Sequence, residues 1–268
     1  MITTAEKKRT AFAVEPRKAV FQPPRIVLNA VEGWGKTSCA AHTPKPYLLM
    51  ANGETGYDTL LGVGLVPAIP AETIDSWKDL MSLCDDMIAA TDLPFKTLAL
   101  DAAGGFEQMC HEFICQRDFK NDWGEKGFAS YQKGYDVSIP EWKGFLDRLD
   151  KIRAKGVMII FLGHAKISPF KNPMGEDFDR YVPDMHHKTW GITHKWADAI
   201  LFGQFVTATE KKAGRTKGIG GTERVLYTER RDAFDAKNRF GMPPEIDIPD
   251  DPSKSWTTIW QHIYRKDK

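Results

Sequence analysis

The sequence lacks the features that mark secreted, membrane-spanning or disulfide-stabilised proteins. Four cysteines occur in 268 residues, too few and too scattered for a disulfide framework in a chain of this length. No apolar run approaches the ~20 residues that a transmembrane helix needs. The opening sequence MITTAEKKRT also has no apolar stretch of the kind that a secretory signal requires. We therefore expect reduced thiols, no membrane partner and a cytoplasmic location.

The sequence also has almost no net charge. Its 37 basic and 36 acidic residues give a formal charge of +1 at pH 7, so binding of nucleic acid would require a local basic face or loop. Hydrophobic residues make up 42% of the chain and charged residues 27%, the composition of an ordinary globular protein with a sizeable core. The length favours one large domain, alone or with a small appendage.

Apolar runs and helical patterns predict an α/β fold. Runs without polar alternation belong to strands that are covered on both faces, and with intervening helices they indicate a parallel sheet. The predicted strands are residues 25–29, 47–51, 97–100, 157–162, 199–202 and 225–228. One predicted helix begins at residue 37, and others cover residues 71–91 and 140–154. The composition of residues 211–222 is typical of a flexible hairpin tip.

Changes in composition divide the chain into three parts. Residues 1–22 are polar and basic and precede a proline pair, so we expect an arm outside the core. Residues 23–250 hold the predicted strands and form the expected main domain. Residues 251–268 are expected to be a C-terminal extension.

A glycine-rich turn follows the first predicted strand. The sequence of residues 30–37, AVEGWGKT, fits the phosphate-loop pattern G-x-x-x-x-G-K-S/T except at Ala30. In such a loop the backbone N–H groups and the helix N-terminus face phosphate oxygens, and Lys36 adds a point charge. A glycine-rich turn that contains Lys-Thr by chance is the alternative. The predicted phosphate-binding residues are Val31, Glu32, Gly33, Trp34, Gly35, Lys36, Thr37 and Ser38.

Two oxygen ligands for a magnesium ion accompany this loop. Thr37 supplies a hydroxyl of the kind that ligates Mg²⁺ in phosphate loops. Asp101 ends a buried strand, where a P-loop fold places the carboxylate that holds Mg²⁺ through water. An acid at the end of a strand is also a common cap, so it is the preceding phosphate loop that favours a metal role for Asp101.

Four segments, in this order, resemble those of the RecA-like ATPases, and especially the phage-encoded single-domain RecA-like (Sak-type) annealing and nucleotide-binding proteins. They are the phosphate loop and residues 51–58 (ANGETGYD), 159–166 (IIFLGHAK) and 235–243 (DAKNRFGMP). The resemblance implies a RecA-like P-loop NTPase fold with a mostly parallel central sheet flanked by helices. It also implies ATP and Mg²⁺ as ligands, and a homo-oligomeric ring or filament whose ATP sites are completed by two subunits.

The resemblance further implies a catalytic set. Glu54 would orient and polarise the attacking water, and Lys36 would hold the phosphates. His164, which stands where the bacterial recombinase has a glutamine, would sense the γ-phosphate. Lys237 and Arg239 would reach the nucleotide of the neighbouring subunit, as arginine fingers do. The alternatives without the resemblance are a solvent-exposed loop acid for Glu54, a structural role for His164 and an ordinary basic turn for Lys237 and Arg239.

Two intervals are the expected contacts with single-stranded DNA, because RecA-like proteins carry two loops that face the axis of the assembly. Aromatic rings can stack on bases while lysines meet phosphates. The first interval contains Phe119, Lys120, Trp123, Lys126, Phe128, Tyr131, Lys133 and Tyr135. The second runs from Lys166 to Pro173 and on to Arg180, His186, His187 and Lys188. Both intervals also hold acidic residues, and aromatic-rich loops equally serve as packing lids.

We therefore expect a DNA-stimulated ATPase that binds single-stranded DNA and acts in annealing or recombination. We expect it to be phage-encoded and located in the host cytoplasm, with a phage single-strand-binding protein as a candidate partner. A helicase-like or loader motor on DNA and a nucleotide-binding switch that acts on a protein partner are the alternatives. Cys110, His111 and Cys115 lie close together in sequence, but their spacing matches no standard zinc site, so a plain helix face is favoured over metal binding.

Overall fold

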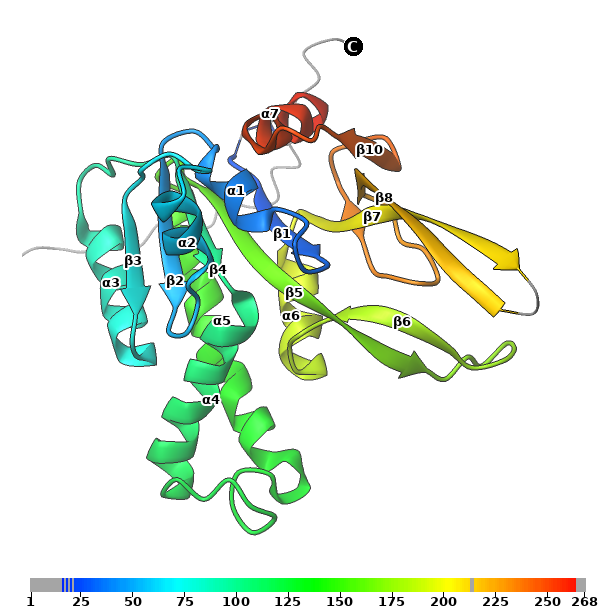
Figure 1. Ribbon diagram of the computed structural model, residues 1–268. Helices are drawn as coiled ribbons and strands as arrows, with labels where there is room; N and C mark the ends of the chain where they lie inside the picture. The colour runs from blue at the N-terminus through cyan, green and yellow to red at the C-terminus, as the bar shows by residue number, and fades with distance from the viewer. Residues whose placement is uncertain (1–15, 17, 19, 21, 213–214, 264–268) are drawn as a thin grey trace, which may run out of the picture.

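The computed structural model describes residues 16, 18, 20, 22–212 and 215–263, with the side chains of residues 207–212 and 215–220 excepted. Most of the expected N-terminal arm therefore lies outside the described residues. Figure 1 shows a central sheet with helices on both faces, from which a helical hairpin and β-hairpins project. None of the described helices is long and apolar enough to cross a membrane.

The central sheet is mostly parallel. Its strand order is β10-β8-β7-β1-β5-β4-β2-β3, so that β1 lies between β5 and β7, and β4 lies on the far side of β5. β8 and β10 extend the sheet in antiparallel pairing, while β6 pairs with β5 and β9 with β7. The strands are β1 (Arg25–Ala30), β2 (Pro46–Ala51), β3 (Ala71–Ile74), β4 (Thr97–Asp101), β5 (Met158–Phe170), β6 (Phe178–Pro183), β7 (Ala199–Lys212), β8 (Arg215–Tyr227), β9 (Lys237–Asn238) and β10 (Glu245–Ile248).

Apolar side chains at alternate strand positions build a core on each face of the sheet. Val27, Ile159 and Phe161 belong to one core, whereas Ile26 and Ile160 belong to the other. The helices that cover the first face are α3 (Trp77–Ala89), α4 (Ala103–Phe119), α5 (Lys133–Arg153) and α6 (His187–Trp196). Those that cover the second are α1 (Lys36–Ala41), α2 (Gly56–Gly62) and α7 (Pro252–Ile263). The expected mostly parallel sheet with helices on both faces is confirmed.

Some predicted elements differ from the structure. The helix predicted for residues 71–91 is present as α3, but its predicted start is wrong. Residues 71–74 form β3, which pairs with β2, and α3 begins only after Ser76, whose hydroxyl accepts a hydrogen bond from the N–H of Asp79. The expected hairpin tip at residues 211–222 is mostly strand, since β7 and β8 pair as far as Lys212 and Arg215. Residues 213–214 lie outside the described part of the chain. Within the expected C-terminal extension, α7 packs into the same core as α1.

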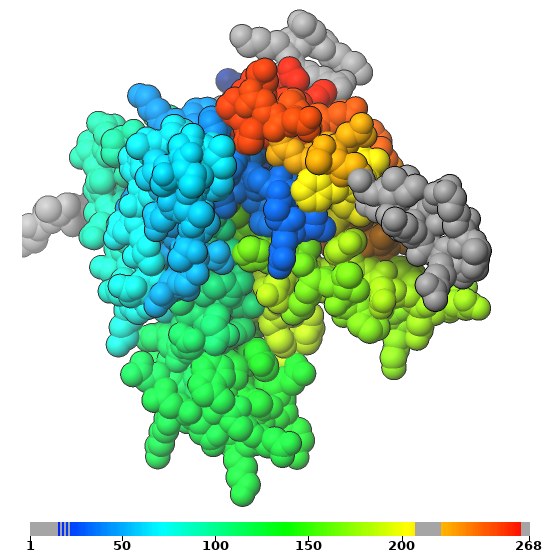
Figure 2. All heavy atoms as spheres, in the orientation of Figure 1, coloured from blue at the N-terminus to red at the C-terminus, as the bar shows by residue number. Residues whose placement is uncertain are grey.

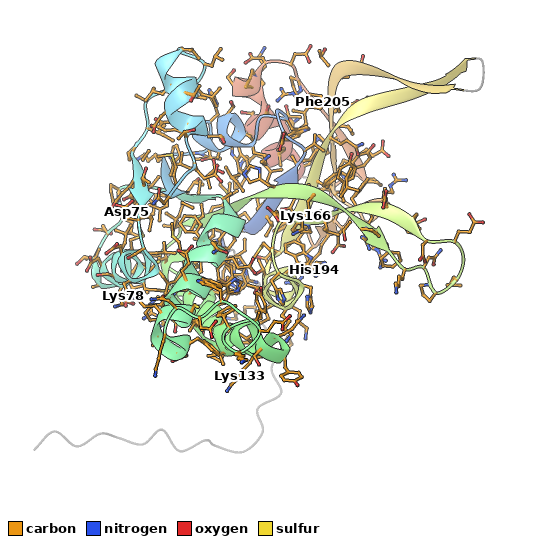
Figure 3. All side chains as sticks on the ribbon, turned by 60° about the horizontal axis from the view of Figure 1, so that its bottom comes forward. Asp75, Lys78, Lys133, Lys166, His194 and Phe205 are labelled. Carbon is orange, nitrogen blue, oxygen red and sulfur yellow. The ribbon has the colours of Figure 1, made fainter. Side chains whose placement is uncertain are left out.

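The first interval expected to contact DNA is not a loop beside the sheet but the outer part of a helical hairpin. α4 and α5 project from the sheet, and residues 120–132 join them at the far end, which stands out as a lobe in Figure 2. Figure 3 shows Lys133 at this outer end. Phe128 is 1% exposed and forms a small core with Ile114 and Cys115. Part of the aromatic pattern therefore serves packing.

The second interval lies on a β-hairpin rather than in a loop. From Ala165 to Phe170, β5 continues beyond its pairing with β1 and β4 and pairs with β6. The β7–β8 hairpin projects on the same side of the molecule in Figure 1. α6 begins shortly after β6, so the histidines and lysine of this interval lie where the hairpin returns to the sheet.

Candidate functional site

The glycine-rich loop turns sharply at the carboxyl end of β1. Gly33 and Gly35 have φ angles of 72° and 101°, in the left-handed region that glycine adopts without strain. A Cβ atom at Gly35 would lie 2.9 Å from Nη1 of Arg224, so a larger residue would collide there. α1 begins directly after this turn, as the phosphate-loop pattern predicts.

Lys36 places a buried positive charge inside this loop. The residue is 7% exposed, and its Nζ donates to the carbonyl oxygens of Ala30 at 3.2 Å and Val31 at 3.4 Å. Burial lowers the pKa of Lys36, while the carboxylates of Asp101 and Glu54 raise it. A buried ammonium group that is held by two loop carbonyl oxygens and lines the pocket is well placed to bind an anion such as phosphate.

Thr37 and Asp101 meet beside Lys36. Oγ1 of Thr37 donates a hydrogen bond to Oδ2 of Asp101 at 2.8 Å. Asp101 is 5% exposed, and burial raises the pKa of its carboxyl group against the opposing effect of this hydrogen bond. A hydroxyl and a carboxylate in contact supply the hard oxygen ligands that Mg²⁺ takes. The two residues therefore fit a magnesium ion.

Glu54 and His164 form a second pair at the same end of the site. Nε2 of His164 lies 3.3 Å from Oε1 of Glu54, and this contact lowers the pKa of Glu54 and raises that of His164. One ligand atom from each of Glu54, Asp101 and His164 lies within 4.8 Å of the other two, the only such group of three in the described part of the chain. The strand order explains this, because the carboxyl ends of neighbouring parallel strands meet at one edge.

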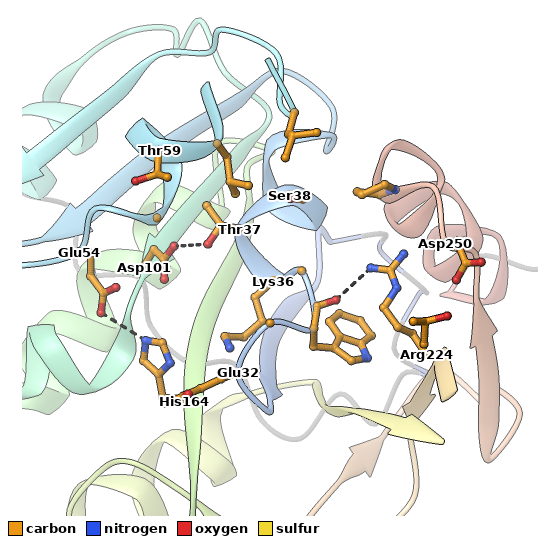
Figure 4. Close-up of a pocket in the computed structure, with 18 residues that line it drawn as sticks. Glu32, Lys36, Thr37, Ser38, Glu54, Thr59, Asp101, His164, Arg224 and Asp250 are labelled. Atoms are coloured by element: carbon orange, nitrogen blue, oxygen red, sulfur yellow. Dashed lines mark hydrogen bonds and ion pairs between the residues drawn. The ribbon is translucent and has the colours of Figure 1, made fainter. Parts of the chain in front are cut away.

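These side chains line one pocket of about 820 Å³, drawn in Figure 4. A pocket of this size accommodates a ligand as large as a nucleotide. The predicted phosphate-binding residues from Glu32 to Ser38 line the pocket, whereas Val31 packs against the core. The structure thus brings the loop together with Glu54, Asp101 and His164, which come from three separate segments.

Arg224 is a pocket residue that the sequence did not reveal. It comes from β8, is 8% exposed, and its Nη1 donates to the carbonyl oxygen of Trp34 at 2.9 Å. Trp34 is fully buried against Gly203, with the guanidinium of Arg224 5.8 Å from its ring centre. Trp34 therefore anchors the loop to the sheet. The two residues are 190 positions apart, and no motif marks the arginine.

Lys237 and Arg239 do not reach this pocket within the chain. β9 pairs with the first residues of β7, at the end of the sheet opposite to the phosphate loop. Nζ of Lys237 donates to the carbonyl oxygens of His194 and Ala197, both at 2.7 Å, where α6 ends. Nη1 of Arg239 lies 3.2 Å from Oδ1 of Asp198. A contact with a neighbouring subunit would have to replace these contacts.

The cysteine-histidine group on α4 does not assemble as a metal site. Cys110 lies in the large core under the sheet, and Cys115 lies in the small core of the helical hairpin. The ring of His111 packs against Phe128 and Tyr135, with ring centres 5.6 and 5.2 Å apart. The favoured interpretation as a helix face agrees with this arrangement.

A second cavity of about 920 Å³ lies among α4, α6 and the β5–β6 hairpin. Lys166 and Arg180 line it from the hairpin, and the rings of Tyr135 and His186 stack at 4.0 Å with an angle of 2° between them. Glu107 accepts hydrogen bonds from the N–H of His186, and burial raises the pKa of Glu107 to about 7. Residues from both expected DNA intervals thus meet in one cavity.

The chain matches one family model over most of its length. Residues 22–240 match the model of the AAA domain. The chain belongs to the AAA domain family. With the phosphate loop at the carboxyl end of β1 and the mostly parallel sheet, this match confirms the expected RecA-like P-loop fold class. No curated protein sequence matches the chain significantly.

Solved structures with a similar chain path include two that span most of this AAA domain protein. The RadB recombinase has a TM-score of 0.45 and 12% identity, and covers 87% of this chain and 90% of its own. The flagellar accessory protein FlaH from Methanocaldococcus jannaschii has a TM-score of 0.45 and 8% identity, and covers 85% of each chain. The resemblance to phage-encoded annealing proteins is not tested by these matches and stays a prediction.

The Glu54–His164 pair predicts a measurable pKa shift. The pKa of His164 is raised, so the stabilisation of the fold by the pair is complete below the ordinary pKa of histidine. It is lost as the pH rises through the raised pKa. The pKa of Glu54 is lowered, so the stabilisation by the pair is also lost when the pH falls through that lowered value. A histidine titration by NMR should therefore show a pKa for His164 above its ordinary ~6.5.

Glu54→Gln should return the pKa of His164 toward its ordinary value, because the bond to the carboxylate is the largest cause of the rise. The matched control is Asp58→Asn, which removes an exposed acid from α2 and should leave the titration unchanged. The same pKa for His164 with and without the Glu54 carboxylate would contradict the pairing.

Proposed function

We propose that the chain is an ATPase that binds single-stranded DNA and acts in annealing or recombination. The ATPase part rests on one observation, the convergence of Lys36, the Thr37–Asp101 pair and Glu54 in a single pocket. Phosphoryl transfer requires this combination, because the phosphates need a cation, the metal needs oxygen ligands and the attacking water needs a positioning group. The resemblance of four segments to phage-encoded proteins supports a phage origin and a role in the host cytoplasm.

Each residue then has a distinct role. Lys36 binds phosphate oxygens, and Mg²⁺ held by Thr37 and Asp101 would neutralise the charge that develops on them. Glu54 accepts a hydrogen bond from the attacking water, and its lowered pKa keeps it ionised at neutral pH. His164 touches Glu54 and lies on β5, so a change in the position of Glu54 acts directly on that strand.

The proposed DNA contact is the second cavity. β5 carries His164 at the nucleotide pocket and Lys166 at this cavity, so the two sites share one strand. Arg180 and Lys166 supply charges for phosphates, although Nζ of Lys166 would have to exchange its contact with Asp184, at 2.8 Å, for a phosphate oxygen. The stacked rings of Tyr135 and His186 suit contact with bases. A phage single-strand-binding protein is the proposed partner, on the resemblance alone.

A homo-oligomeric ring or filament completes the proposal. Lys237 and Arg239 lie at the end of the sheet opposite to the phosphate loop, so one subunit could present them to the loop of the next. Burial and the charge of Arg239 lower the pKa of Lys237. Both lysine and arginine would exchange a contact within the chain for a contact with phosphate.

A nucleotide-binding switch that acts on a protein partner is the second candidate. Its support is the outer end of the α4–α5 hairpin, where Tyr131 is 100% exposed and Trp123 is 43% exposed. Exposed aromatic rings at the tip of a projecting hairpin are typical anchors for a protein partner. ATP turnover that does not respond to any DNA, single-stranded or duplex, would favour the switch, whereas a helicase-like motor would also separate duplex strands.

Glu54→Gln should bind ATP normally and hydrolyse it slowly, with or without single-stranded DNA. The amide keeps the shape of the side chain and loses the basic oxygens, and removal of a general base costs about 10²-fold or more in rate. ATP affinity by equilibrium binding and phosphate release with and without single-stranded DNA would be measured together, with Asp58→Asn as the control. Unchanged turnover would place the catalytic carboxylate elsewhere.

Mixing two inactive variants should restore activity if Lys237 acts on a neighbouring subunit. Lys237→Ala is expected to lower turnover by about 10³-fold with little loss of nucleotide binding, as for other residues that act in trans. Lys36→Ala subunits lack a working loop but keep Lys237. An interface that joins an intact loop to an intact Lys237 can form only in the mixture.

The melting temperature of each variant is the control for this experiment, because Lys237 also binds the end of α6. Turnover by the unmodified chain that is independent of protein concentration, with no recovery in the mixture, would contradict the trans role. Lys237 and Arg239 would then serve only to fix the end of α6 and Asp198 within their own chain.

A further inference from the structure

The nucleotide pocket has a second end that the phosphate-binding residues do not occupy. Figure 4 shows Glu54 and His164 on one side of the loop, and Arg224 and Asp250 on the other. Arg224 and Asp250 lie at this end (Figure 4), and Thr222 and Pro252, which are close to them in sequence, also line the pocket. A nucleoside triphosphate bound by its phosphates at Lys36 would extend its nucleoside into this space.

Part of this end comes from outside the matched family region. The family match stops at residue 240, whereas Asp250 lies between β10 and α7, and Pro252 is the first residue of α7. α7 is not a loose tail, because Trp256 and Ile259 are buried in the same core as α1. The C-terminal segment therefore forms a fixed wall of the pocket.

Arg224 ties this wall to the phosphate loop. Its Nη1 donates to the carbonyl oxygen of Trp34, and its Nη2 donates to the carbonyl oxygen of Pro249 and lies 3.5 Å from Oγ of Ser255. One buried side chain thus fixes the loop, the residue before Asp250 and the first turn of α7 relative to one another. Asp250 is consequently held at a set distance from the phosphate site.

Asp250 has the chemistry of a recognition group. It is exposed at the pocket, and within residues 22–212 and 215–263 it has no hydrogen-bond or ion-pair partner. The pocket also carries Leu60 and Leu65, from α2 and the turn after it, as an apolar surface against which a flat ring can pack. A carboxylate only accepts hydrogen bonds, so it selects a ligand with N–H or O–H donors.

We propose that Asp250 recognises the nucleoside half of the bound triphosphate by accepting a hydrogen bond from it, so that the C-terminal segment completes the nucleotide site. This inference rests on the proposed function, because it needs the phosphates at Lys36. The donor is the amino group of the base or the 2′-hydroxyl group of the ribose, and the two sources are separable with nucleotide analogues.

The test is equilibrium binding of ATP and of inorganic triphosphate to Asp250→Ala and to the unmodified chain. Asp250→Ala should bind ATP about 10-fold more weakly, the effect of losing one hydrogen bond to a charged group, and should bind inorganic triphosphate unchanged. The matched control is Asp247→Ala, which removes an exposed acid of β10 that does not line the pocket. It should leave both affinities unchanged.

Two analogues identify the donor. If Asp250 accepts from the ribose, dATP should bind the unmodified chain more weakly than ATP, and Asp250→Ala should remove that difference. If it accepts from the base, inosine triphosphate, which lacks the amino group of adenine, should show the same pattern. Equal binding of all three nucleotides by the unmodified chain would overturn the proposal.

Equal ATP affinity for Asp250→Ala and the unmodified chain would also overturn the proposal that Asp250 recognises the nucleoside. So would an equal loss of ATP and inorganic triphosphate binding, because Asp250 would then act on the phosphate end or on the fold. A different failure belongs to the proposed function. If the unmodified chain bound neither ATP nor inorganic triphosphate, the phosphate site itself would be contradicted.

Discussion

The burial of the Lys36 ammonium group is the constraint on which the site depends. A buried charge is costly unless other groups compensate it, and here the loop carbonyls of Ala30 and Val31 and the carboxylates of Asp101 and Glu54 surround it. The acids can gather there because β2 and β4 are parallel neighbours that end at one edge of the sheet. The same burial that lowers the pKa of Lys36 raises that of Asp101, so both groups gain from a bound phosphate and metal.

The parts of the site that the sequence predicted are those carried by local patterns. A glycine-rich turn between a buried strand and a helix locates Lys36 and Thr37 without any tertiary information. Asp101 could be added because it ends an apolar strand, and the ends of neighbouring parallel strands must meet. The placement of Glu54 and His164 in the same pocket agrees with the resemblance, while their roles stay predictions.

The parts that were missed depend on distant segments or on packing. Arg224 and Asp250 reach the pocket through antiparallel strands added to one edge of the sheet, and no local pattern shows that pairing. Phe128 looked like a ring for stacking on bases, but it closes a small core in the α4–α5 hairpin. Lys237 looked free to act on a neighbour, whereas the end of α6 supplies carbonyl partners for it.

The most direct test of the central claim is the equilibrium binding of ATP, with and without Mg²⁺, to the unmodified chain and to Lys36→Ala. The unmodified chain should bind ATP more tightly when Mg²⁺ is present. Lys36→Ala, shown by its melting curve to be folded, should lose that binding. Retention of full ATP affinity by folded Lys36→Ala would contradict the assignment of the phosphate site.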